Sequence, residues 1–207
     1  MKIIYEPVSF ELKNEKAIIE LLKNDFRNSF IAATAQYKSL LADLPHKNKG
    51  VILGCRVSAV KKFKGDSIVF VGDGVFHALM LKKEFRDRKV FILNPFNLNV
   101  KEVFEEDVRK FDFREAVSLD YLKRAVKVGI ILSSKSGQFS LDNALRIKEK
   151  LENDGKKVYL FLFDNVNPDE FMNFKGIDCL VNTACPRIGM DDYKKFPVPV
   201  VNANIIL

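Results

Sequence analysis

The sequence predicts an α/β protein of two small domains, each built on a mostly parallel β-sheet flanked by helices. Short apolar runs alternate with amphipathic stretches along the 207 residues, the pattern of βαβ units with right-handed crossovers. Residues 68–71 and 130–132 are apolar throughout, which is typical of parallel strands covered on both faces. A long helical stretch at 101–127 divides the strands into two groups, so we expect domains at 1–120 and 121–207.

The expected strands are short, and most are rich in β-branched or aromatic residues. In the first domain they occupy residues 2–8, 30–34, 51–55, 67–71 and 90–93, and in the second 128–133, 158–163, 178–183 and 198–202. Helices are expected between them at 15–24, 35–44, 76–84, 103–117, 141–153 and 168–174. The helix at 141–153 has the clearest signals, because Ser140 can cap its start and Gly155 can end it.

Composition indicates a reduced, cytoplasmic protein. No apolar run reaches 18 residues, so no membrane-spanning helix is expected, and residues 1–6 lack the apolar core of a signal peptide. Three cysteines are too few for a disulfide framework. The net charge of +7 fits either a solvated surface or electrostatic docking on another protein. Direct binding of nucleic acid is not expected, because no RNP or zinc-finger motif is present.

Two cysteines follow apolar runs at the points where strands should end. Cys185 is followed at once by Pro186, which cannot continue a central strand, and Cys55 follows the run at 51–54. Ligands of parallel α/β sheets bind at the carboxyl ends of strands. Cys179 lies inside the predicted strand at 178–183, and we expect it to be a buried packing residue.

Two further loops could bind an anionic ligand. The Gly72-Asp73-Gly74 turn opens a helix whose first N–H groups could meet a carboxylate or phosphate, and the serine-rich loop 133–138 follows another strand. Neither loop has the spacing of a P-loop or of a dinucleotide-binding glycine motif. His77, beside an apolar run, suits a structural role somewhat better than a catalytic one, and His46 is expected to be exposed.

Taken together, these loops resemble the diphthamide-biosynthesis radical enzymes, the 2-(3-amino-3-carboxypropyl)histidine synthases. The resemblance rests on Thr-Ala-Gln at 34–36, Leu-Gly-Cys at 53–55 and Val-Gly-Asp-Gly-Val-Phe-His at 71–77. It continues through Gly-Ile-Ile-Leu-Ser at 129–133, Gly-Gln at 137–138 and Thr-Ala-Cys-Pro-Arg at 183–187, followed by Asp-Asp at 191–192. The order and spacing of these motifs cover nearly the whole chain.

The resemblance implies an iron–sulfur transferase. Members of that family bind a 4Fe-4S cluster through three cysteines, one from each of three similar α/β domains, and bind S-adenosylmethionine at the open iron. A 3-amino-3-carboxypropyl radical then adds to a histidine of translation elongation factor 2. By this likeness the chain matches the second and third domains, and Cys55 and Cys185 would bind the metal. No residue is assigned a catalytic role, and the residues that would line the cofactor cleft are Gln36, Asp73, Gly74, His77, Gln138 and Arg187.

The family's first domain, with its cysteine, has no counterpart in this sequence. We therefore expect a component of the transferase whose third ligand comes from a partner chain or a homo-oligomer, and in which Cys55 and Cys185 approach each other. The alternative is a non-catalytic relative, a scaffold or an S-adenosylmethionine-binding protein without a cluster. An unrelated metabolite-binding α/β protein would require all the motif matches to be coincidental.

Overall fold

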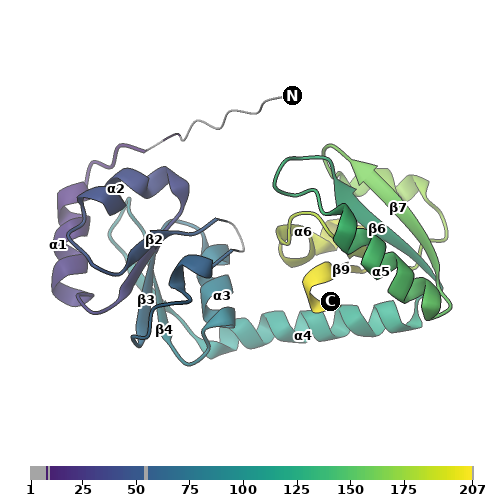
Figure 1. Cartoon of the computed structure of the whole chain (residues 1–207), viewed down its shortest axis with the longest axis horizontal. Coiled ribbons are helices and arrows are strands. Elements are labelled where there is room, and N and C mark those ends of the chain that lie inside the picture. Colours follow the sequence, from purple (N-terminus) through teal and green to yellow (C-terminus); the bar gives the residue numbers. More distant parts are fainter. Residues whose placement is uncertain (1–7, 9, 54–55, 207) are drawn as a thin grey trace. The chain divides into compact units, whose positions relative to one another are not determined.

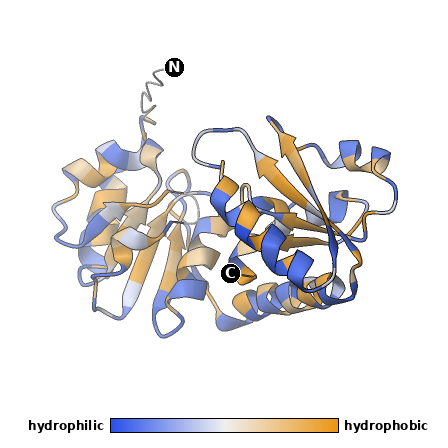
Figure 2. Ribbon diagram, turned by 45° about the vertical axis from the view of Figure 1, so that its right-hand side comes forward, coloured by the Kyte–Doolittle hydropathy of each residue, from blue (hydrophilic) through white to orange (hydrophobic). Residues whose placement is uncertain are grey.

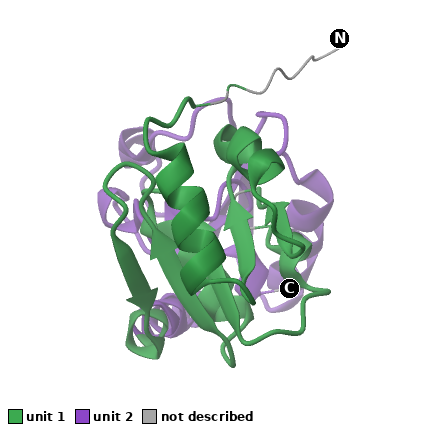
Figure 3. Ribbon diagram, turned by 90° about the vertical axis from the view of Figure 1, so that its left-hand side faces the viewer, with its two compact units in different colours: residues 1–109 green, residues 110–207 purple. Residues whose placement is uncertain are grey.

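The computed structural model describes residue 8, residues 10–53 and residues 56–206. The chain divides into two compact units, residues 1–109 and residues 110–207 (Figures 1 and 3). The division falls in the long helix α4 (Glu105–Arg124), and the expected boundary after residue 120 falls in the same helix. Each unit is an α/β structure on its own sheet, so the predicted fold class is confirmed.

Unit 1 contains a five-stranded sheet in the order β2-β1-β3-β4-β5. Four strands are parallel, and β5 pairs antiparallel with β4. Ala33 is aligned with both Val51 and Val71, so three strands end at the same edge of the sheet. The strands are β1 (Phe30–Ala33), β2 (Lys49–Val51), β3 (Ser67–Val71), β4 (Lys89–Leu93) and β5 (Val100–Val103).

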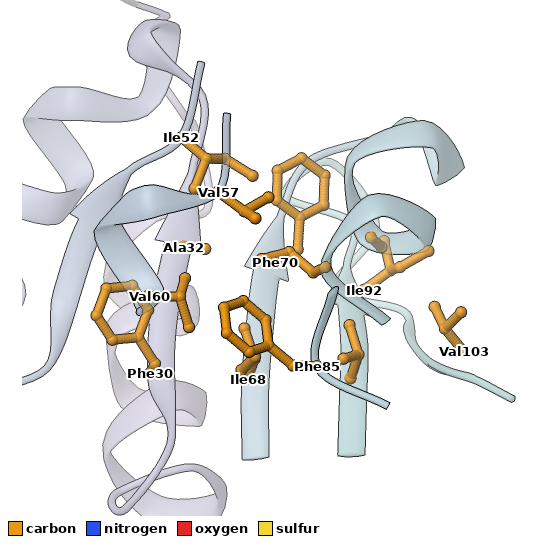
Figure 4. Close-up of a cluster of buried hydrophobic side chains, with 13 residues drawn as sticks. Phe30, Ala32, Ile52, Val57, Val60, Ile68, Phe70, Phe85, Ile92 and Val103 are labelled. Carbon is orange, nitrogen blue, oxygen red and sulfur yellow. The ribbon is translucent and has the colours of Figure 1, made fainter. Parts of the chain in front are cut away.

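Side chains along β1 alternate between two cores. Ile31 and Ala33 pack with α1 (Glu15–Asp25) and α2 (Lys38–Asp43) on one face of the sheet. Phe30 and Ala32 belong to the core of the other face, which contains α3 (Val75–Glu84) and the 3-10 turn η2 (Ser58–Val60) (Figure 4). Covering both faces explains why the central strands are apolar at nearly every position.

Unit 2 contains a four-stranded, wholly parallel sheet in the order β7-β6-β8-β9. Helix α5 (Leu141–Asn153) and the C-terminal end of α4 pack on one face of this sheet, and η3 (Pro168–Asn173) packs on the other. Figure 2 shows apolar strands in both units and an alternation of apolar and polar residues along α5. The strands are β6 (Lys127–Ser133), β7 (Lys157–Phe163), β8 (Cys179–Asn182) and β9 (Val200–Asn202).

The edge strand β7 differs from the other strands of unit 2 in its exposure. Within the described part of the chain, β7 pairs with β6 on one side and has no strand on the other. Tyr159, Leu160 and Leu162 are exposed although they are large and apolar, and the exposed fraction of Leu162 is 63%. The outer edge of this seven-residue strand is therefore accessible for pairing along this side of the unit.

Most predicted elements are present, and the helix at Leu141–Asn153 has its predicted bounds, with Gly155 at φ +80° after its end. One strand prediction is wrong in place, and another cannot be compared with the described residues. The second strand spans Lys49–Val51 rather than 51–55, and residues 54 and 55 lie outside the described part. The expected strand at 2–8 falls almost entirely outside it as well, and its one described residue, Val8, has no regular structure.

Two other expectations are corrected by the structure. Val103 belongs to strand β5 rather than to the helix, because it pairs with Val90 and is buried against the sheet. His46 is only 9% exposed, because the chain folds back beside the start of β1 and brings its Nε2 to 3.0 Å from the carbonyl oxygen of Ser29. None of the described helices combines the length and apolar character needed to cross a membrane.

Candidate cofactor-binding loops

In unit 1, the Thr-Ala-Gln motif and the Gly-Asp-Gly turn leave neighbouring strands at one edge of the sheet. β1 and β3 are adjacent and parallel, with Ala33 opposite Val71. Thr34 and Gln36 follow the first of these strands, and Asp73 follows the second. The parallel register thus brings Gln36 and Asp73 to the carboxyl edge, as the strand-end argument requires.

Tyr37 is hydrogen-bonded to Gln36 and lies within the electrostatic influence of Asp73, and sequence reasoning missed it. Its side chain is 1% exposed, and its hydroxyl is hydrogen-bonded to the side chain of Gln36. Burial raises the pKa of Tyr37, the hydrogen bond from Gln36 opposes this, and the charge of Asp73 adds to the rise. The available signal was helical spacing, because Tyr37 continues the apolar series at Leu40, Leu41 and Leu44.

The Gly72-Asp73-Gly74 turn connects β3 to α3. The N–H of Gly72 donates to the carbonyl of Leu93 at 3.0 Å, and a side chain on Gly72 would collide with the ring of Phe70. Gly74 lies at the N-cap of α3 and has open space where a Cβ would stand. Asp73 and Gly74 are both exposed. A ligand could therefore approach this turn closely at Gly74.

His77 packs on the other face of the same sheet. Its ring stacks on Phe70 with centroids 5.2 Å apart and meets Phe76 edge-on at 5.3 Å. Phe70 belongs to the α3-side core, whereas Tyr37 belongs to the core on the α1 and α2 side. The aromatic contacts give His77 a packing role, in line with the structural interpretation that its sequence position favoured.

Cys55 lies outside the described residues, but its flanks are placed. Ile52 donates its N–H to the carbonyl of Ala33 at 2.8 Å, which puts it at the carboxyl end of β1. Leu53 and Arg56 exchange backbone hydrogen bonds of 3.3 and 2.9 Å. The flanks of the cysteine therefore share the sheet edge of Gln36 and Asp73.

In unit 2, Cys185 follows a strand end, as predicted. β8 ends at Asn182, and Thr183 is bound to Ile131 of β6 through both its N–H, at 3.0 Å, and its hydroxyl, at 2.8 Å. Cys185 is a free, partly exposed thiol, and Pro186 precedes the short helix α6 (Arg187–Met190). Cys179 is 0% exposed in the core, so its predicted packing role is confirmed.

Two buried asparagines fix the backbone on both sides of Cys185. The Oδ1 of Asn182 accepts from the N–H of Ala184 at 3.0 Å. Its Nδ2 donates to the Cys185 carbonyl at 2.9 Å and to Oδ1 of Asn202 at 2.8 Å. The Nδ2 of Asn202 donates to the carbonyl of Pro186 at 2.9 Å. Sequence reasoning missed this pair, although Val-Asn at the end of two apolar strands was a visible signal.

The space around Asn202 is limited on one side and open on another. A Cβ added to Gly189 would stand 2.5 Å from Oδ1 of Asn202, so only glycine fits beside this amide. A hollow of about 270 Å³ also borders Asn202, and its other walls include the α4 side chains Phe113, Val117 and Tyr121. The described wall residues of this hollow do not include Cys185.

Arg187 lies two residues after Cys185 and pairs with Asp191. Its Nε is 2.6 Å from Oδ2 of Asp191, and this hydrogen bond is the main cause that raises the pKa of Arg187. The nearby charges of Cys185 and Asp192 act in the same direction. A guanidinium is therefore fixed next to the cysteine loop.

The loop that carries Gln138 leaves the same sheet edge as the cysteine loop. β6 and β8 are adjacent and parallel, with Ile131 opposite Asn182. Ser133 accepts from the N–H of Lys135 at 3.2 Å, and Gly137 has φ +80°. Gln138 is half-buried at the end of this turn. Unit 2 thus gathers Gln138, Cys185 and Arg187 at one edge.

The fold and these loops define an α/β protein with a cysteine loop at a parallel strand end. The family model described as "Putative diphthamide synthesis protein" matches residues 1–204. The 2-(3-amino-3-carboxypropyl)histidine synthase of Methanocaldococcus jannaschii is 38% identical over 191 residues, which cover 91% of this chain and 54% of that protein. The protein of the same name from Pyrococcus horikoshii is 35% identical over 153 residues, 73% of this chain and 43% of its own length.

A solved structure agrees with these sequence relatives. It is described as Dph2 from Pyrococcus horikoshii with a 4Fe-4S cluster, and it matches with a TM-score of 0.71 and 25% identity over 93% of this chain and 59% of that one. The chain belongs to the diphthamide synthesis protein family. It spans about half the length of the curated relatives that it matches.

Proposed function

We propose that this chain forms part of a cytoplasmic 2-(3-amino-3-carboxypropyl)histidine synthase. Its reaction would transfer the 3-amino-3-carboxypropyl group of S-adenosylmethionine to a histidine of translation elongation factor 2. Family membership and the names of the relatives support this proposal. The observation that carries it is Cys185, a partly exposed thiol in a rigidly bonded loop at a strand end.

The donor chemistry of the chain fits an iron–sulfur cluster. Thiolates are the usual ligands of such clusters, and Cys185 is accessible whereas Cys179 is enclosed in the core. Cys55 is proposed as the second ligand, on the strength of its motif. The relative from Pyrococcus horikoshii is described with a 4Fe-4S cluster. Since Cys179 is the only other cysteine in the sequence, a third thiolate would come from outside these 207 residues.

The reduced cluster would supply the electron that cleaves S-adenosylmethionine. The residues of this chain would bind and orient that cofactor. Asp73, which is exposed, would offer a carboxylate to the cofactor's amino group, and Gly74 would leave room for close approach. Arg187 would offer positive charge to a carboxylate, and Gln36 and Gln138 would offer amides. His77 would support the first of these loops through its contact with Phe70 rather than by touching the cofactor.

The proposal is tested by anaerobic purification, reconstitution with iron and sulfide, and measurement of iron per chain. The wild type should bind iron, Cys185→Ala and Cys55→Ala should lose it, and Cys179→Ala should retain it. Equal loss in the Cys179 and Cys185 variants would overturn the ligand assignment. A wild-type chain that binds no iron but binds S-adenosylmethionine in calorimetry would instead indicate a non-catalytic relative.

A further inference from the structure

We propose that the amide pair Asn182–Asn202 positions Cys185 for metal binding. The two side chains are 2% and 6% exposed, and each is the last residue of a parallel strand, β8 and β9. These strands are adjacent, with Asn182 opposite Asn202. The inference rests on the proposed function, since it takes Cys185 to be a ligand.

The pair acts on three consecutive residues of the loop. Asn182 binds the N–H of Ala184 and the carbonyl of Cys185, and Asn202 binds the carbonyl of Pro186. The bond from Nδ2 of Asn182 to Oδ1 of Asn202 joins the two amides into one network. The backbone on each side of the thiol is therefore fixed by buried side chains, which act on the cysteine through its main chain.

Such a network is sensitive to the loss of any one donor. Both N–H bonds of the Asn182 amide are used, one toward Cys185 and one toward Asn202. Replacing either asparagine by aspartate puts an oxygen where a donor stood, opposite a partly buried carbonyl oxygen or the buried amide oxygen of the other asparagine. Outer-shell partners of this kind typically contribute about 10–100-fold to metal affinity. The shape of the side chain is kept, so packing alone would predict little change.

Gly189 provides a second way to disturb the same pair. A methyl group at this position would collide with all three terminal atoms of the Asn202 amide, at 2.5 to 2.8 Å. Gly189→Ala adds no polar group and removes no hydrogen-bonding atom. If the position of the Asn202 amide controls how Cys185 binds the metal, Gly189→Ala should therefore speed iron loss as an Asn202 variant does. If it does not, Gly189→Ala should behave like the wild type.

The experiment compares Asn202→Asp, Gly189→Ala and the control Asn204→Ala, an exposed neighbour, after reconstitution with iron and sulfide. The rate of iron loss to a chelator and the electron paramagnetic resonance spectrum of the reduced protein are measured. Both test variants should lose iron about 10-fold faster or more and show an altered spectrum. The control should match the wild type. Iron retention and spectra identical to the wild type in both test variants would overturn the inference.

A double variant separates positioning from general damage. In the Asn202→Ala background the space beside Gly189 is free, so Gly189→Ala should add little further loss; additive losses would contradict the inference. Alkylation of Cys185 in the metal-free protein gives a second readout if Asn202→Asp folds poorly, because Gly189→Ala should still change its rate. If Cys185 is not a metal ligand, Cys185→Ala should retain as much iron as the wild type. That result would contradict the proposed function itself, and it differs from the result that would contradict the positioning role of Asn202.

Discussion

Asp178 binds the backbone N–H of Lys127 through its carboxylate at 2.7 Å, and it binds the N–H of Val126 at 2.9 Å with the same oxygen. This contact ties the start of β8 to the start of β6, the two central strands of unit 2. The bond from Lys127, followed by that from Val126, holds the pKa of Asp178 below its ordinary value. The charged carboxylate is therefore the form that the fold favours.

Asp178→Asn should lower the free energy of unfolding by about 1 kcal/mol at pH 7. Because the folded pKa is depressed, the contribution of Asp178 is present above its ordinary pKa of about 3.9 and is lost as the pH falls through the folded value. The difference between wild type and variant in urea unfolding should thus shrink below about pH 4. A difference that stays constant over this range would contradict the assignment, and Asp87→Asn, at an exposed position, serves as the control.

The two described cysteines should differ in reactivity. Burial raises the pKa of Cys179 to about 12, and the side chain is enclosed, whereas Cys185 is partly exposed. Iodoacetamide at pH 8 should modify Cys185 in the native protein and Cys179 only after unfolding. Peptide mass spectrometry measures both sites in one sample. Native modification of Cys179 at the rate of Cys185 would show that the core opens.

The hydroxyl of Tyr37 should lose its proton at a higher pH than an ordinary tyrosine. Burial favours the neutral phenol, so the folded pKa of Tyr37 is raised above its ordinary value of about 10. Stability gained from the neutral form is complete below that value and is lost as the pH rises through the folded pKa. The absorbance difference between wild type and Tyr37→Phe should therefore appear only above about pH 10. A difference already complete at pH 10 would contradict a buried phenol.

Gly129→Ala should destabilise unit 2. A Cβ in the middle of β6 would stand 2.6 Å from the ring of Phe161 and 2.8 Å from Leu180, which leaves no room for a methyl group. Overpacking of this kind costs about 1–3 kcal/mol. Gly74→Ala, with no atom within 4 Å of the new Cβ, avoids this overpacking and should cost less than about 1 kcal/mol, the effect of exchanging glycine for alanine at an N-cap. Chemical denaturation of both variants gives the comparison.

Sequence patterns predicted the elements that depend on local signals. The helix Leu141–Asn153 has a marked apolar face and a glycine after its end, and its bounds were predicted correctly. Strand β5 was missed because Val-Lys-Glu-Val carries only two apolar residues and runs directly toward a helix. Its pairing with β4 is decided by tertiary contacts, such as Val103 with Val90, which no local pattern records.

The candidate loops were found because parallel strands bring their carboxyl ends to one edge, and Cys185 and Gln138 share such an edge. The residues that support them were not found. Val-Asn at two strand ends and the helical spacing of Tyr37 were visible signals, but the hydrogen bonds that give Asn182, Asn202 and Tyr37 their roles depend on tertiary contacts and burial, which no local pattern records. His46 was misplaced for the same reason, because its partner Ser29 is 17 residues away.

The exposed edge of β7 should make the protein prone to self-association. A strand with unpaired backbone groups and protruding Leu160 and Leu162 side chains can join another strand of the same kind. Turbidity of concentrated samples should therefore rise with time and temperature, and faster in high salt, where the repulsion between chains of net charge +7 is screened. A single Leu162→Lys replacement, at the most exposed of these positions, would place a charge on the strand edge and should slow this rise in turbidity.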